Sequence, residues 1–274
     1  MQNRCFGSIA LIAMALADPA AAADMPVKAP VAKAVALFNW TGCHAGINGG
    51  LGWGADTGER DATTFVGVGL EVTPSTFGLK PNGIFGGGQV GCNLQHGGIV
   101  FGWEADIQGS GIGGRANQNL ASGLELTAST AQHTLDWFGT VRGRVAFTPT
   151  PELLLYVTGG LAYGELSDRA SVRGMGSGLI GTFSDAVDGN RVGWTVGGGG
   201  ELALSSRDWS FKAEYLYVDL GSRTLHLANN PIFPASFIDY DFEHRYHIVR
   251  VGLNYRFGDF GKGPVGKGPI VTRY

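Results

Sequence analysis

The chain has 274 residues, including 46 glycines and 11 prolines, and its formal net charge at pH 7 is -3. So much glycine and proline excludes a helical bundle, and the lack of a strict three-residue glycine period excludes a collagen-like chain. The small negative charge, without a basic stripe, excludes a nucleic-acid partner.

Residues 1–23 have the layout of a secretory signal peptide. Arg4 lies in a short basic region, residues 6–17 form an apolar core, and small residues precede the cleavage site that we expect between Ala23 and Asp24. After this segment no apolar run reaches the roughly 18 residues that a membrane-spanning helix needs. We expect residues 24–38 to form a periplasmic N-terminal segment.

Eight segments alternate apolar and polar residues, and this period of two predicts β-strands. In LDWFGTVRGRVAFTP one face carries Leu135, Trp137 and Val141, and the other carries Arg142 and Arg144. The eight predicted strands are residues 39–53, 82–95, 99–108, 135–149, 152–164, 191–204, 208–218 and 244–257.

The connections between these strands alternate in length. Short turns lie near residues 95–98, 148–151 and 205–208, and long loops near 54–81, 109–133, 166–190 and 219–243. Outer-membrane barrels have short periplasmic turns and long extracellular loops, and only helices and closed barrels satisfy the backbone in a bilayer. The sequence therefore predicts an all-β fold, an eight-stranded antiparallel transmembrane β-barrel with an up-and-down meander over residues 39–257. Its apolar face would meet lipid, and both termini would be periplasmic.

Aromatic residues near both ends of the apolar faces predict two interfacial belts. We expect an outer belt of Trp53, Trp137, Tyr163, Trp194 and Tyr217. We expect an inner belt of Phe147, Trp209, Phe211, Tyr255 and Phe257.

Charged residues gather on the face that would line the lumen: Glu104, Asp106, Arg142, Arg144, Glu201, Lys212, Glu214 and Arg250. Strand order predicts that Glu201 lies opposite Lys212, that Glu104 and Asp106 lie beside the two arginines of the next strand, and that Glu214 lies near Arg250. Buried charges need partners, and eight strands leave room for side chains and little else. A packed plug of ion pairs is favoured over a wide pore, and a narrow low-conductance path stays as an alternative.

Several segments carry a family resemblance, above all NWTGCHAGINGGLGWG, FGWEADIQGS, LDWFGTVRGRVAF, KAEYLYVDLG and HIVRVGLNYRF. They resemble the small porin-like, immunogenic outer-membrane proteins of alphaproteobacteria, a family that includes hemin-binding members. The resemblance implies an eight-stranded barrel that is abundant at the cell surface as an antigen. The chain departs from the family by having cysteines at positions 43 and 92 in place of aromatic residues. It also continues past Phe257 as a tail, residues 258–274, that is rich in glycine, proline and lysine and that we expect in the periplasm.

The expected function is that of a structural porin-like protein that supports envelope integrity and presents four loops outside. A surface adhesin, a hemin-binding protein and a low-conductance pore are the alternatives. The expected partners are outer-membrane lipids, lipopolysaccharide and, through the C-terminal aromatic strand, the barrel-assembly machinery. No enzyme is expected, because G-x-S-x-G and H-E-x-x-H motifs are missing and nothing brings a serine to His133 and Asp136.

No cofactor is expected, and heme is the alternative. The residues His226, His244, His247, Tyr240 and Tyr246 are of the types that ligate heme iron. The favoured interpretation is that these rings sit at the barrel rim, where amphipathic side chains suit the interface.

Two cysteines, Cys43 and Cys92, would remain after signal cleavage. Both lie on the outward face near the periplasmic ends of sequential antiparallel strands, so they should lie opposite each other. The periplasm is oxidising, which permits a disulfide, but cross-strand bridges are often strained. A free pair is the favoured expectation, with the bridge as the alternative.

Overall fold

The computed structural model describes residues 38–54, 58–61, 75–122, 125–176, 179–206, 208–227 and 238–257. The expected signal peptide with its Ala23–Asp24 cleavage site, nearly all of the segment 24–38, and the tail 258–274 lie outside the described residues. Within the described ranges no helix is long and apolar enough to cross a membrane.

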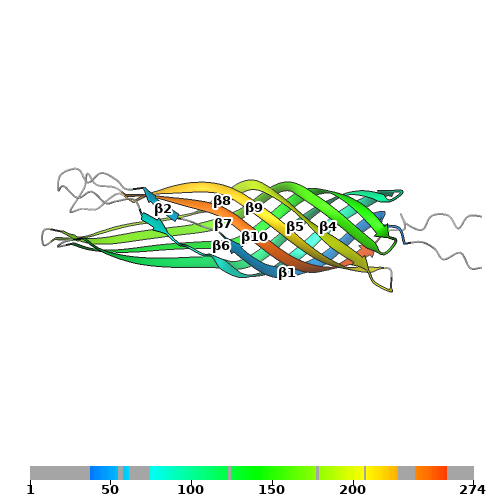
Figure 1. Ribbon diagram of the computed structural model, residues 1–274, viewed down its shortest axis with the longest axis horizontal. Coiled ribbons are helices and arrows are strands. Elements are labelled where there is room, and N and C mark those ends of the chain that lie inside the picture. The colour runs from blue at the N-terminus through cyan, green and yellow to red at the C-terminus, as the bar shows by residue number, and fades with distance from the viewer. Residues whose placement is uncertain are drawn as a thin grey trace, which may run out of the picture. The chain divides into compact units, whose positions relative to one another are not determined.

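Eight long antiparallel strands close into a barrel, as the sequence predicts (Figure 1). Each strand pairs with the next along the chain, and the first strand also pairs with the last. The barrel strands are β1 (Gly42–Gly54), β4 (Asn82–His96), β5 (Ile99–Ser122), β6 (Glu125–Thr150), β7 (Leu153–Gly176), β8 (Leu179–Ala203), β9 (Trp209–Leu227) and β10 (Ile238–Phe257). A short hairpin, β2 (Gly58–Asp61) and β3 (Ser75–Phe77), continues the sheet beside one end of β10.

The outer face of the barrel is apolar over the segment that would cross the membrane. Outward side chains such as Ile47, Ile84 and Val192 are 68%, 71% and 71% exposed. In β9 the burial alternates from Trp209 to Leu220, with Trp209 and Phe211 outside and Ser210 and Lys212 inside. An outward apolar band around a polar interior is the arrangement of a lipid-embedded barrel.

The strands extend much further than the sequence predicts on the side away from the short turns. The loops expected at residues 109–133 and 166–190 are wrong, because β5, β6, β7 and β8 pair through most of both segments. The reason is that alternation continues there with small apolar side chains facing inward. Together with residues of β9, β10 and the segment after β3 they form a buried cluster of Leu79, Ala131, Ala170, Val172, Leu225, Leu227 and Phe242.

Two strands change face just beyond the outer aromatic residues. In β6 the register shifts between Leu135 and Trp137, so that Leu135 is buried and Asp136 is exposed. The expected outward position of Leu135 is therefore wrong. One extra residue in the strand moves every side chain between it and the extended end of β6 to the other face. In β9 the change occurs at Gly221, whose φ of 81° favours glycine.

The interior is filled in layers. The end at which the short turns lie is closed by Phe38, Trp40, Val100, Ala146, Leu154 and Tyr156. Above the charged residues lies a second apolar layer of Phe85, Ile112, Leu135, Phe138, Ala162, Leu166, Leu216, Val218, Leu220, Tyr246 and Ile248. Glycine permits close strand approach around these layers, since a Cβ atom on Gly50 would lie 2.1 Å from the Val249 carbonyl oxygen.

Candidate functional site

The charged residues of the lumen form one connected network. All eight of the predicted interior residues are buried. Arg142 lies at its centre, with its guanidinium nitrogens 2.6 Å from Glu104, 3.0 Å from Asp106 and 2.8 Å from Glu214. Arg250 reaches the same three carboxylates from β10, at 3.2, 2.9 and 2.6 Å.

Glu201 and Lys212 lie opposite each other in the β8–β9 register, as the strand order predicts, but their ion-pair partners are other residues. The Lys212 ammonium instead lies 2.6 Å from the Glu104 Oε1 atom, across the lumen. Glu201 pairs with Arg144 at 3.2 Å and accepts a hydrogen bond from the Asn254 amide at 2.9 Å. Long side chains in a narrow lumen can choose partners on distant strands.

The network is balanced in charge. Four carboxylates, Glu104, Asp106, Glu201 and Glu214, meet four cations, Arg142, Arg144, Lys212 and Arg250. A buried ion costs several kcal/mol in desolvation unless partners and hydrogen bonds compensate it. Glu104, Asp106 and Glu214 are each shared among several cations. Glu201 combines its ion pair to Arg144 with a hydrogen bond from Asn254. These contacts provide the compensation, so the arrangement is a packed plug between two apolar layers.

A second polar layer lies inside the barrel toward the end away from the short turns. The His133 Nδ1 atom lies 2.6 Å from the Asp168 Oδ1 atom, and its Nε2 atom contacts the Tyr246 hydroxyl. His244 stacks on His133 with ring centroids 4.8 Å apart. Asp136 does not take part in this layer, because the β6 bulge turns its side chain outward. Asp168 was missed because it lay in a segment predicted as a loop.

Burial and hydrogen bonding shift the pKa values of Asp168 and His244 in this layer, which lies outside the membrane-spanning segments. Burial alone would raise the pKa of the Asp168 carboxyl, but the hydrogen bonds and charges of His133 and His244 together outweigh that effect and hold the pKa well below its usual range. Burial lowers the pKa of His244, although Asp168 opposes this. Both shifts favour a carboxylate beside a neutral His244 imidazole.

Among the described residues, His133, Asp168 and His244 form a group that could hold a metal ion. One ligand atom from each lies within 4.8 Å of the other two. Other features disfavour a dication. Both ring nitrogens of His133 already have partners, and the Arg223 guanidinium lies 3.6 Å from Asp168. The geometry fits a hydrogen-bonded structural layer better than a metal centre.

The histidines and tyrosines that could ligate heme iron do not lie around one site. His244 and Tyr246 point into the lumen and are buried. His247 faces outward, where its Nδ1 atom lies 2.7 Å from the Tyr215 hydroxyl. His226 is exposed on β9, and the side chain of Tyr240 lies outside the described part of the chain. The described members of this set therefore do not converge on one heme.

The outward aromatic residues lie in two groups near opposite ends of the membrane-spanning strand segments. At one end Trp137 contacts Tyr163, and Trp194 contacts Tyr217, which contacts His247 beside Trp53. At the other end Trp209 contacts Tyr255, while Phe257, Phe147 and Phe211 pair in register with Cys43, Ile99 and Leu253. This matches the heights at which two membrane interfaces would lie.

Cys43 and Cys92 lie directly opposite each other in the β1–β4 register, with Cα atoms 4.0 Å apart. Their sulfur atoms are bonded as a disulfide. The favoured expectation of a free pair is therefore wrong. The bridge joins the first two barrel strands at the end where the short turns lie.

Comparison with known proteins gives a consistent set of similarities. Residues 8–257 match the family described as outer membrane protein beta-barrel domain. The chain is 39% identical over 253 residues to the 31 kDa outer-membrane immunogenic protein of Brucella melitensis, covering 91% of this chain and 98% of that protein. It is 32% identical over 145 residues to the 22 kDa outer membrane protein of Rhizobium leguminosarum bv. viciae, covering 52% and 56%. The crystal structure of OprG from Pseudomonas aeruginosa aligns over 81% of this chain and 99% of its own, with 12% identity and a TM-score of 0.49.

Proposed function

Because this chain belongs to the outer membrane protein beta-barrel domain family, we propose that it is a structural, porin-like surface protein of the bacterial outer membrane. Its closed barrel would contribute to envelope integrity, with both termini in the periplasm and the extended end of the barrel outside the cell. Its partners would be outer-membrane lipids, lipopolysaccharide and, during insertion, the barrel-assembly machinery reading the strand that ends at Phe257.

The observation that carries this proposal is the filled lumen. Arg142 and Arg250 span the centre of the barrel and share Glu104, Asp106 and Glu214. Apolar layers lie on both sides of that network. An eight-stranded barrel filled in this way leaves no wide aqueous path, which favours a structural role over conduction.

Planar-bilayer recording of the purified barrel tests this proposal. We expect no stable single-channel openings from the wild-type protein. As a comparison, Arg142→Ala combined with Arg250→Ala removes the two side chains that span the lumen and should raise the frequency of small openings. Steady conductance from the wild-type barrel, equal to that of the double variant, would refute the structural role.

The extended hairpins support a second candidate function, that of a surface antigen. Strands β5 to β8 continue as paired strands well past the outer aromatic residues. The Brucella relative is named as immunogenic. If this end is exposed, antibodies raised against residues 109–122 and 166–176 should bind intact cells. Binding only after the cells are permeabilised would contradict that orientation.

A further inference from the structure

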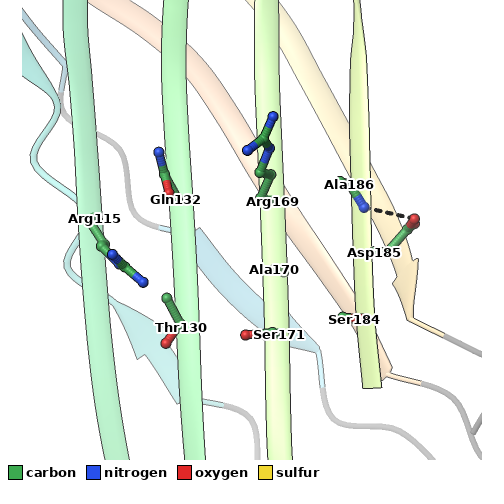
Figure 2. A pocket seen from close by; sticks show the side chains of 9 residues that line it. All are labelled: Arg115, Thr130, Gln132, Arg169, Ala170, Ser171, Ser184, Asp185 and Ala186. Carbon is green, nitrogen blue, oxygen red and sulfur yellow. Dashed lines mark hydrogen bonds between the residues drawn. The ribbon is translucent and has the colours of Figure 1, made fainter. Parts of the chain in front are cut away.

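A depression of about 370 Å³ lies on the outer wall of the barrel across β5, β6, β7 and β8, beyond the outer aromatic belt (Figure 2). Two arginines and four uncharged polar side chains line most of it: Arg115, Thr130, Gln132, Arg169, Ser171 and Ser184. The proposed structural role does not involve this surface.

The strand register places the two arginines on either side of one amide. Arg115 pairs with Gln132, and Gln132 pairs with Arg169. With strands about 4.8 Å apart, the two arginine backbones lie about 10 Å apart. Figure 2 shows the Arg115 side chain directed toward β6, and the Arg169 side chain extended along β7 beside Gln132. The bulge at Asp136 is what turns Gln132 outward between them.

The two arginines carry uncompensated charge in the part of the chain that the structure describes. The extracellular ion pairs there use Arg223 and Arg245, and none uses Arg115 or Arg169. The nearest acidic side chain of the depression, Asp185, accepts a hydrogen bond from the backbone N–H of Ala186 at 2.8 Å. The depression is therefore a cationic surface with an acidic rim.

The height of the depression above the membrane limits which parts of a lipid can reach it. Arg169 follows the belt residue Tyr163 by six positions along β7. With a rise of about 3.3 Å per residue and a tilt of about 40°, its backbone lies about 15 Å above that ring. The Arg169 side chain points back along β7 toward Tyr163. This level lies above the hydrocarbon and within the sugar layer of the outer leaflet.

The chemistry of the lining matches an anionic sugar. A guanidinium donates two parallel hydrogen bonds to a phosphate or carboxylate group. The amide of Gln132 and the hydroxyl groups of Thr130 and Ser171 both donate and accept, as sugar hydroxyl groups require.

We propose that this depression binds the anionic saccharide headgroup of lipopolysaccharide, with a phosphate or carboxylate held between Arg115 and Arg169. Gln132, Thr130 and Ser171 would hydrogen-bond the adjoining sugar. This inference deepens the lipid partnership of the proposed function and rests on the outer-membrane location given there.

Titration of the detergent-purified barrel with rough-type lipopolysaccharide in mixed micelles tests the proposal. Arg115→Gln combined with Arg169→Gln should raise the dissociation constant about tenfold, because two charge-assisted contacts are lost. Lys80→Gln, which removes a positive charge from an exposed side chain outside the depression, should leave it unchanged. Asp185→Asn should tighten binding, because it removes the acidic rim.

Equal affinity of the wild type and the double variant, with the gel heat-shift of both intact, would overturn the proposal. So would complete displacement of lipopolysaccharide by millimolar inorganic phosphate, since that result identifies a site for free anions. Because the binding measurement does not depend on conductance, a conducting barrel would refute the structural role and leave this result standing.

Discussion

Glu104 and Arg142 face each other in the register of β5 and β6, and the Arg142 Nη2 atom lies 2.6 Å from the Glu104 Oε1 atom. The same oxygen also lies 2.6 Å from the Lys212 ammonium and 3.2 Å from the Arg250 guanidinium. One carboxylate therefore holds cations from three other strands and connects distant parts of the barrel wall.

Replacing Glu104 should destabilise the barrel more than replacing any exposed acid. Glu104→Gln leaves Arg142, Lys212 and Arg250 with one negative charge fewer in a buried lumen, and we expect a loss of about 3–5 kcal/mol. Urea unfolding of the barrel in lipid vesicles measures this. Glu152→Gln, at an exposed side chain, is the control, and equal midpoints for both variants would show that the plug does not stabilise the barrel.

Glu201 should be coupled energetically to Arg144 and not to Lys212, its neighbour in register. A double-mutant cycle for Glu201→Ala and Arg144→Ala should give a coupling of about 1–3 kcal/mol. The corresponding cycle with Lys212→Ala should give a much smaller coupling, because the Lys212 ammonium contacts Glu104. A larger coupling to Lys212 than to Arg144 would contradict the observed pairing.

Acid should destabilise the end of the barrel away from the short turns through His244. Its pKa is lowered in the folded protein by burial, so near pH 6.5 the unfolded chain binds more protons and the free energy of unfolding falls as pH decreases. The lowered pKa of Asp168 acts in the same direction below about pH 4. His133, Tyr246, Arg191 and Arg223 surround the pair and add no carboxylate.

Thermal midpoints from gel heat-shift at pH 8 and pH 5 test this dependence. His244→Phe keeps the ring stacked on His133 and should flatten the change between the two pH values. His226→Gln on the exposed surface should leave the wild-type change intact. A wild-type midpoint that is constant from pH 8 to pH 5 would count against the role of His244.

The disulfide should be complete in the mature protein. Thiol labelling of the denatured protein should give no signal without reductant and two labelled cysteines with it. Cys43→Ser combined with Cys92→Ser should lower the free energy of unfolding by about 2–4 kcal/mol, since the bridge closes a loop with a sequence separation of 49. Two labelled cysteines in the untreated protein would show that the pair is free.

Alternation along the chain predicts the eight-stranded barrel and, within the membrane-spanning segments, the face of each strand that meets lipid. Alternation with a period of two is a local property, and it survives in β9, where Trp209 and Phe211 point outward and Ser210 and Lys212 point inward. Sequential antiparallel pairing then placed Cys43 opposite Cys92 and Glu201 opposite Lys212.

Which side chains meet in the lumen depends on the bulge in β6 and on closure of the barrel, not on local alternation. The bulge at Asp136 reversed the faces of β6, so His133 meets Asp168 and Gln132 lies between two arginines. Closure of the barrel brought Lys212 to Glu104 on a strand that is not its neighbour. Neither result is visible in the local pattern, because an extra residue leaves little mark on alternation and a flexible side chain pairs across the lumen by distance, not by sequence.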